Sequence, residues 1–364
     1  MQAKKLILKS FRNYEEEVIG FCPDVNIIHG DNAQGKTNIL EAVYLFSMGK
    51  SNRAKRDAEL IRHGDEMATL ALDFSNSQRD FQGEMSIFRT RRKNITINEL
   101  PVRKNSELVG KFRVVYFGPE YLSLVKEGPK QRRKNIDILI SQLRPNYFSA
   151  LSDLKKLIES KNALLKMDKP NIAMLDILNE KMSGLSADII KYRQEYIEKI
   201  GSLSAELQRE ISGGKEELKI NYISCVGEIE GLSSSELKEK LVKKLEESKQ
   251  REIDYRESII GPHREDIEYY INDKEAKLFA SQGQQKTIVL SQKLAEVQLM
   301  NHETGEMPVL LLDDIMSELD KKRQGFILKN IGRMQIIITC TDIDGFDIDN
   351  KTKLFFVENG KIKG

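Results

Sequence analysis

A glycine-rich segment near the start of the chain carries the residue types that bind phosphate. In the pattern Gly-x4-Gly-Lys-Ser/Thr, glycines let backbone N–H groups approach phosphate oxygens, the lysine reaches the β and γ phosphates, and the hydroxyl holds magnesium. We therefore predict a nucleotide site, with a catalytic lysine and a threonine as metal ligand. Its residues are Gly30, Asp31, Asn32, Ala33, Gln34, Gly35, Lys36, Thr37 and Asn38.

The neighbours of this loop support the nucleotide interpretation. Residues 25–29 form a short, apolar run rich in β-branched residues, which predicts a buried strand, and residues 38–43 continue with helical spacing. The order strand, loop, helix is the one that a phosphate-binding loop requires. A glycine-rich turn without a ligand is the alternative, and this order disfavours it.

An acidic pair provides the expected partner of the phosphate loop. Residues 309–312 are apolar and predict a buried strand, which delivers Asp313 and Asp314 at its carboxyl end. We expect Asp313 to support magnesium and Asp314 to polarise the attacking water. Asp314 is one methylene shorter than the usual glutamate, so hydrolysis should be slow. The alternative is that both acids cap the following helix.

A third motif lies about 30 residues before the acidic strand. Ser and Gly at a helix start can meet a γ-phosphate presented by another subunit. The order of motifs resembles that of an ATP-binding cassette, in which two nucleotides lie between two copies of the protein, although a plain helix N-cap is the alternative. The predicted signature comprises Ser281, Gln282, Gly283 and Gln284, and the predicted D-loop contains Ser317 and Asp320.

The arrangement of predicted elements indicates an α/β fold. We expect an ABC-type, SMC head-like P-loop ATPase that is split in sequence into residues 1–125 and 255–364. Residues 126–254 form an inserted, mostly helical arm domain, with a helical hairpin over residues 148–210 whose arms are about 40 Å each at 1.5 Å per residue. A turn at residues 167–171 separates the arms, and a β-hairpin is predicted at Asn272 and Asp273.

Composition is that of a globular protein. The chain has 364 residues, of which 31% are charged and 40% apolar. No apolar run has membrane-spanning length and no signal-peptide core is evident, so we expect a cytoplasmic, nucleoid-associated protein. The three cysteines are isolated, which disfavours structural zinc.

Net charge is only +2, so any DNA-binding surface must be local. Three short basic clusters without interleaved acids are candidates for sequence-independent phosphate contacts, although ordinary solvated surface is the alternative. The candidate residues are Lys50, Arg53, Lys55 and Arg56, then Arg91, Arg92 and Lys93, and finally Arg132 and Arg133.

Taken together, these motifs resemble the RecF family of bacterial recombination-mediator ATPases, which is related to SMC heads. The matching segments are residues 6–14, 30–38, 117–122, 128–129, 132–133, 261–264, 281–286, 311–314 and 317–320. The resemblance implies ATP and Mg²⁺ as cofactors and an ATP-dependent homodimer on double-stranded or gapped DNA. It also implies work with RecR, and through it RecO and RecA, in DNA repair, replication, recombination and the SOS response.

Two departures from cassette ATPases fit a weak ATPase that serves as a switch. The region after Phe117 offers no evident glutamine for a Q-loop, and Cys340 stands in the region where transporters keep a switch histidine. Two other classes remain open. A transporter's nucleotide-binding subunit typically keeps its motifs closer together, and an SMC-like architectural chromosome protein extends its arms into long heptads.

Overall fold

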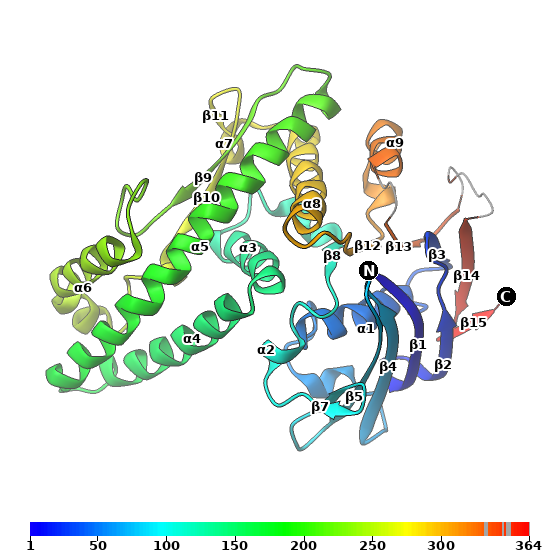
Figure 1. Cartoon of the computed structure of the whole chain (residues 1–364), viewed down its shortest axis with the longest axis horizontal. Helices are drawn as coiled ribbons and strands as arrows, with labels where there is room; N and C mark the ends of the chain where they lie inside the picture. Colours follow the sequence, from blue (N-terminus) through cyan, green and yellow to red (C-terminus); the bar gives the residue numbers. More distant parts are fainter. Residues whose placement is uncertain (331–333, 344–345, 347–350, 364) are drawn as a thin grey trace. The chain divides into compact units, whose positions relative to one another are not determined.

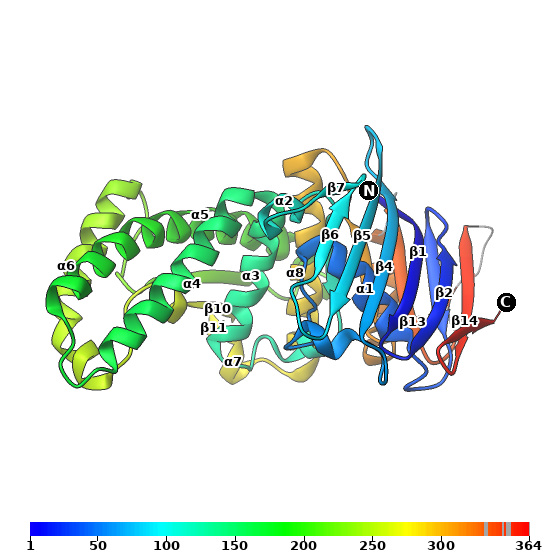
Figure 2. The same cartoon turned by 90° about the horizontal axis from the view of Figure 1, so that it is seen from below.

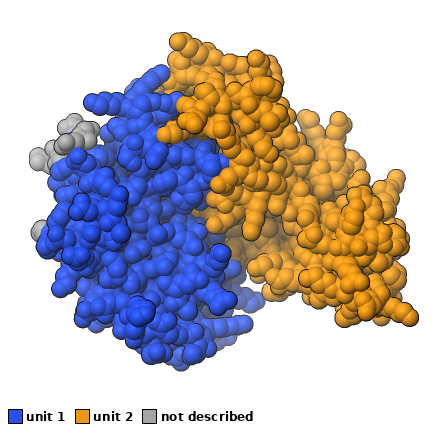
Figure 3. Space-filling view, turned by 180° about the vertical axis from the view of Figure 1, so that it is seen from behind, with its two compact units in different colours: residues 1–123, 289–364 blue, residues 124–288 orange. Residues whose placement is uncertain are grey.

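Two segments that are far apart in the sequence fold together into one unit. The computed structural model describes residues 1–330, 334–343, 346 and 351–363. Unit 1 comprises residues 1–123 and 289–364, and unit 2 comprises residues 124–288 (Figures 1 and 3). The phosphate loop and the acidic strand both belong to unit 1, which is therefore an α/β unit split in sequence, as predicted.

The strand before the phosphate loop lies in a six-stranded sheet. Neighbouring strands in this sheet are parallel, except for the antiparallel pair at one edge. The strands Val309–Asp313 and Ile336–Cys340 are buried along their whole lengths, as their apolar sequences require. In spatial order the strands are β15 (Lys361–Lys363), β14 (Thr352–Glu358), β3 (Val25–His29), β13 (Ile336–Cys340), β12 (Val309–Asp313) and β8 (Val114–Phe117).

A second six-stranded sheet in unit 1 is antiparallel (Figure 2). Buried and more exposed residues alternate along its strands. One face of the sheet is therefore apolar and buried, and the other carries the polar side chains. Its strands are β2 (Tyr14–Gly20), β1 (Gln2–Phe11), β4 (Met67–Ser75), β5 (Asp80–Phe88), β6 (Asn94–Ile97) and β7 (Leu100–Pro101).

Helix α1 (Lys36–Met48) contacts strands of both sheets and is almost entirely buried between them. It begins after Gly35 and ends at Gly49, and both glycines adopt left-handed conformations. The remaining short helices of unit 1 are the 3₁₀ helices Asp57–Leu60, Pro119–Ser123 and Met316–Glu318, together with α2 (Asn105–Leu108) and α9 (Lys321–Asn330).

Unit 2 is mostly helical and includes a three-stranded antiparallel sheet of order β11-β10-β9. The predicted hairpin at Asn272 and Asp273 is confirmed, and both residues have the positive φ of a type I′ turn. The elements are α3 (Pro129–Leu143), α4 (Pro145–Leu165), α5 (Ile172–Ser212), β9 (Leu218–Ile223), α6 (Ser234–Tyr255), the 3₁₀ helix Pro262–Arg264, β10 (Asp266–Ile271), β11 (Lys274–Glu275), α7 (Ala276–Phe279) and the start of α8 (Gln282–Thr304).

The helical hairpin differs from the prediction in its proportions. Its turn falls between Leu165 and Ile172 as expected, and Asn171 caps α5 by accepting a hydrogen bond from the Met174 amide. However, α4 has 21 residues and α5 has 41, which correspond to about 31 and 62 Å. Helix α5 continues because its second half packs on α3 and β9.

The structure places the second unit boundary after residue 288, whereas the sequence suggested 254. Strand β10 pairs along its whole length with β9, so residues 266–271 fold with the helical unit. The predicted signature at residues 281–284 therefore belongs to unit 2. Across the described ranges, no helix is both long and apolar enough to cross a membrane.

Buried ion pairs hold the elements of unit 2 together. The Arg193 guanidinium is buried and lies 3.0 Å from Asp137, and it also donates to the Pro262 carbonyl at 2.6 Å. Lys161 and Glu252, both fully buried, lie 2.6 Å apart. Removing one partner of such a pair leaves an uncompensated buried charge, so substituting any of these residues should destabilise unit 2.

Candidate nucleotide site

The phosphate loop has the conformation that its glycines allow. Gly30 and Gly35 have φ of 144° and 115°, a region that residues with a Cβ seldom adopt. A Cβ on Gly30 would lie 2.3 Å from the Val357 carbonyl oxygen. The Lys36 ammonium donates to the carbonyls of Gly30 and Asp31 at 2.6 and 3.0 Å, so it lies at the centre of the loop. These positions suit a polyphosphate at the N-terminus of α1.

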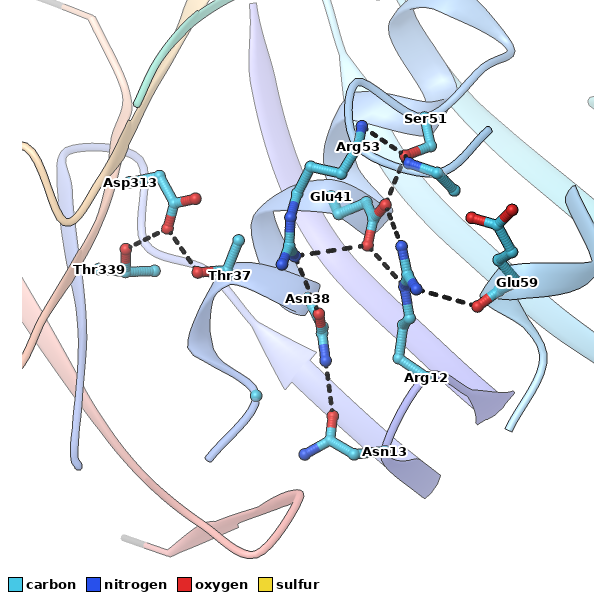
Figure 4. Close-up of polar contacts among 12 residues, drawn as sticks. Arg12, Asn13, Thr37, Asn38, Glu41, Ser51, Arg53, Glu59, Asp313 and Thr339 are labelled. Atoms are coloured by element: carbon cyan, nitrogen blue, oxygen red, sulfur yellow. Dashed lines mark hydrogen bonds and ion pairs between the residues drawn. The ribbon is translucent and has the colours of Figure 1, made fainter. Parts of the chain in front are cut away.

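The acidic strand and the phosphate loop meet as the sequence predicted. Asp313 at the end of β12 accepts a hydrogen bond from the Thr37 hydroxyl at 2.8 Å (Figure 4). Both residues offer oxygen ligands, which Mg²⁺ prefers, and Mg²⁺ commonly takes only one or two protein ligands beside substrate phosphates and waters. The donor set therefore fits magnesium held by Thr37 and Asp313.

Two further hydroxyls orient the Asp313 carboxylate. Tyr116 from β8 and Thr339 from β13 each donate to it at 2.7 Å. Burial, followed by the Asp313 charge, raises the pKa of Tyr116 well above its ordinary value, so the phenol remains a donor. Sequence reasoning did not identify either residue. Their positions at the carboxyl ends of the strands beside β12 were the available signal.

Asp314, the candidate water-polarising residue, lines one pocket together with Thr37 and Asp313. Asp314 has a φ of 49°, and its amide donates to the Thr339 hydroxyl at 2.9 Å. Burial, with the Asp313 charge adding to it, raises the pKa of Asp314. The pocket has a volume of about 440 Å³, and its lining includes Thr37, Asn52, Arg53, Tyr116, Pro119, Glu120, Asp313 and Asp314. In the region after Phe117, where we found no glutamine for a Q-loop, the residue that lines this pocket with a carboxylate is Glu120.

A buried carboxylate on α1 organises the pocket wall (Figure 4). Glu41 accepts two hydrogen bonds from the Arg12 guanidinium, at 2.7 and 2.8 Å, and one from the Ser51 hydroxyl, and it lies 3.7 Å from Arg53. Arg53 also donates to the Asn38 side chain at 3.2 Å. We did not predict this cluster from the sequence, although a glutamate inside an apolar helical run signals a buried partner.

The predicted signature forms a capping box at the start of α8. The Ser281 hydroxyl accepts a hydrogen bond from the Gln284 amide at 3.2 Å, and the Gln284 side chain accepts one from the Ser281 amide at 2.9 Å. Ser281 and Gln282 are exposed, while Gly283 is half-buried. The N-cap that we considered as an alternative is thus present, and it leaves the signature residues at the surface of unit 2.

The predicted D-loop residues lie beside the acidic strand in unit 1. The Ser317 hydroxyl donates to the Asp314 carbonyl at 2.8 Å. Asp320 accepts a hydrogen bond from the Arg323 amide at 3.0 Å and forms an ion pair with the Arg323 side chain, so it caps α9. The hydrogen bond from the Arg323 backbone lowers the pKa of Asp320.

The structure contradicts the predicted DNA contact of Arg132 in the third basic cluster, whereas that of Arg133 stays a prediction. Arg132 is buried and forms a bidentate ion pair with Asp266 at 2.8 Å, so the prediction for Arg132 is wrong. Arg133 is half-buried and donates to the Glu265 carbonyl. Both arginines bind the segment that directly follows residues 261–264.

The other two basic clusters lie next to each other in unit 1. Lys93 is mostly buried and forms an ion pair with Asp57 at 2.9 Å, which joins the 3₁₀ helix Asp57–Leu60 to the loop between β5 and β6. Arg91 covers the Phe88 ring at 3.7 Å. We call the exposed members the basic rim, and they are Lys50, Arg53, Lys55, Arg56, Arg91 and Arg92.

One cysteine, Cys340, stands in the region where transporters keep a switch histidine. Cys340 is buried at the end of β13, and burial raises the pKa of its thiol to about 12. Within the described part of the chain, no group of three or more histidine, cysteine, aspartate or glutamate side chains is arranged to hold a metal ion.

Comparison with known proteins gives consistent matches over the whole chain. The family model "RecF/RecN/SMC N terminal domain" matches residues 2–363. The DNA replication and repair protein RecF of Clostridium perfringens (strain SM101 / Type A) is 41% identical, with 100% of each chain covered. The protein of the same name from Acetivibrio thermocellus is 40% identical, with 96% of each chain covered.

Solved structures agree with the sequence relatives. A structure described as the recombination mediator protein RecF with ATPrS in the RecFOR pathway has a TM-score of 0.93 and 36% identity, and covers 100% of this chain and 97% of its own. An SMC head bound to the C-winged helix domain of ScpA has a TM-score of 0.58 at 17% identity, covering 100% of this chain and 96% of its own, and shows likeness of fold alone.

Proposed function

The chain belongs to the RecF family, and from this premise we propose that it is an ATP-dependent, DNA-binding recombination mediator. The observation that carries the proposal is the contact between Thr37 and Asp313, because it joins the phosphate loop to the acidic strand in one pocket. The relatives described with ATP or its analogue support nucleotide binding at this site.

ATP acts as a switch in this proposal, and its hydrolysis is slow. Asp314 carries its carboxylate one methylene closer to the backbone than a glutamate would, so it reaches a water near the γ-phosphate less readily. The ATP-bound state therefore persists.

The ATP-bound state is a homodimer in which Ser281 and Gly283 of one copy meet the γ-phosphate held by the other. The exposure of Ser281 at the N-terminus of α8 supports this contact. Replacing Ser281 with alanine should abolish ATP-induced dimers, as should Lys36→Met. Ser233→Ala is the matched control, because Ser233 heads an equivalent capping box on α6. Light scattering with and without ATP measures the result, and persistent dimers in both site variants would refute it.

The dimer binds double-stranded DNA at gaps or junctions through the basic rim. Fluorescence anisotropy with a gapped duplex, under ATP, ADP and no nucleotide at two salt concentrations, tests this step. We expect tight, salt-sensitive binding with ATP only. The double variant Arg91→Ala/Arg92→Ala should weaken binding uniformly, while Lys243→Ala/Lys244→Ala removes the same charge from exposed positions on α6. Equal binding in all nucleotide states would contradict the proposal.

On DNA, the protein works with RecR, and through it RecO, to help load RecA. The family relationship supports this last step. A reconstituted assay of RecA filament formation on gapped DNA, with RecO and RecR present and this protein added or omitted, would test it. No change in filament formation would refute the mediator role while leaving ATP and DNA binding intact.

A further inference from the structure

The second half of the phosphate loop is held by two hairpin turns from opposite ends of the chain. The Gln34 carbonyl accepts hydrogen bonds from the Asn13 side chain at 2.7 Å and from the Gly360 amide at 3.2 Å. The Gln34 side-chain oxygen accepts a third from the Asn359 amide at 2.6 Å. Asn13 lies between β1 and β2, and Asn359 and Gly360 form the turn between β14 and β15.

The C-terminal turn has the geometry needed to donate both amides outward. Asn359 and Gly360 have φ of 51° and 69°, and they connect the paired residues Glu358 and Lys361. This is a two-residue type I′ turn, for which Asn-Gly is the favoured sequence. The ladder bonds of such a turn use the flanking residues, so the two central N–H groups are available to Gln34.

The two turns also touch each other, which makes their positions interdependent. A Cβ on Gly360 would lie 2.5 Å from the Asn13 carbonyl oxygen. The Asn13 side-chain oxygen accepts a hydrogen bond from Asn38 at 2.8 Å, on the first turn of α1. Tyr14 donates to the Gly35 carbonyl at 3.0 Å. The Asn359–Gly360 turn is therefore coupled to the loop that precedes α1.

We propose that the Asn359–Gly360 turn is a positioning element for nucleotide binding. In a planar trans peptide the C=O and the following N–H point in opposite directions. The two donors that fix the Gln34 carbonyl therefore also fix the Gly35 N–H, which points away from them. With that amide turned toward the phosphates, the loop is preorganised for the ligand and does not have to be ordered during binding. This inference rests on the proposed ATP binding.

The test compares two glycine variants with equal backbone strain. Gly360→Ala places a Cβ against the Asn13 carbonyl, whereas Gly305→Ala has nearly the same φ, 70°, and no atom within 4 Å of the added Cβ. The measurements are the dissociation constant of a fluorescent ATP analogue and the urea midpoint without nucleotide. We expect both variants to lose stability because of the positive φ, and Gly360→Ala to lose more because its Cβ meets the Asn13 backbone. Only Gly360→Ala should raise the dissociation constant, by at least tenfold.

A second variant guards against misfolding of the first. Gln34→Met keeps the side-chain length and removes the acceptor for the Asn359 amide, so its dissociation constant should rise several-fold with an unchanged urea midpoint. If Gly360→Ala binds the ATP analogue with wild-type affinity, the positioning role is overturned. If Gly360→Ala does not fold, wild-type affinity of Gln34→Met for the analogue overturns it instead. Absence of ATP binding by the wild-type protein would instead refute the proposed function together with this inference.

Discussion

Replacing Glu41 with glutamine should destabilise unit 1 without changing its shape. The Glu41 side chain is fully buried and is shared by Arg12, Arg53 and Ser51. Glutamine has nearly the same volume and keeps one acceptor oxygen, but it removes the negative charge. The two guanidinium groups would then face each other across a neutral amide, and one of the bonds from Arg12 would meet an NH₂ donor.

The expected size follows from how far these charges are from water. Breaking a buried ion pair by removing one partner costs about 3–5 kcal/mol. The Arg12 and Arg53 side chains are 22% and 43% exposed, so solvent relieves part of this cost. We therefore expect a loss of about 2 kcal/mol, which at a urea slope near ~2 kcal/mol/M moves the midpoint by about 1 M.

Urea unfolding followed by circular dichroism measures this effect. Glu66→Gln is the matched control, because Glu66 is exposed and the substitution makes the same change in net charge. The control should shift the midpoint little, since exposed substitutions usually change stability by less than about 0.5 kcal/mol. If both variants unfold at the same urea concentration, Glu41 is not the centre of a buried ionic cluster and the reasoning fails.

Two other predictions concern single side chains. Tyr116→Phe removes one hydrogen-bond donor from the Asp313 carboxylate, so it should lower the free energy of unfolding by about 1.5–3 kcal/mol. It should also raise the Mg²⁺ concentration needed for ATP binding. An unchanged Mg²⁺ titration would contradict the role of Tyr116 in orienting Asp313. Burial lowers the pKa of His263 from 6.5 to about 4. The unfolded state therefore binds the proton first, and unit 2 should lose up to ~3 kcal/mol as pH falls from about 6.5 to 4. His263→Gln should remove that part of the slope in acid unfolding, and an identical slope in both proteins would show that His263 is not the group responsible.

The strands of the nucleotide site were predictable because their signals are local. Strand β3 has the bounds that its apolar run indicated, and β12 extends one residue beyond its predicted end, to Asp313. Short β-branched runs bounded by turn residues specify a strand without reference to distant residues. The Asn359–Gly360 turn carried the same kind of signal, an Asn-Gly pair between strand-like segments, although it is not among the turns that we predicted.

The partners of charged side chains were not predictable in this way. Arg132 and Asp266 are 134 residues apart, and the pattern of lysines and arginines around Arg132 resembles that of an exposed cluster. Only the pairing of β10 with β9 brings Asp266 beside α3. The same pairing places the unit boundary after residue 288. We predicted it after residue 254, because nothing in the composition of residues 255–288 distinguishes them from the α/β unit.

The signature motif shows that a structural and a functional interpretation can describe the same atoms. A serine hydroxyl accepts two hydrogen bonds and donates one. Capping of α8 uses Ser281 as an acceptor from the Gln284 amide, which leaves its donor capacity untouched. An anion requires a donor, and the cap holds the exposed hydroxyl at the positive end of the helix, where an anion is stabilised. The N-cap is therefore compatible with the proposed contact between Ser281 and a phosphate, so a capping role for Ser281 does not argue against the signature.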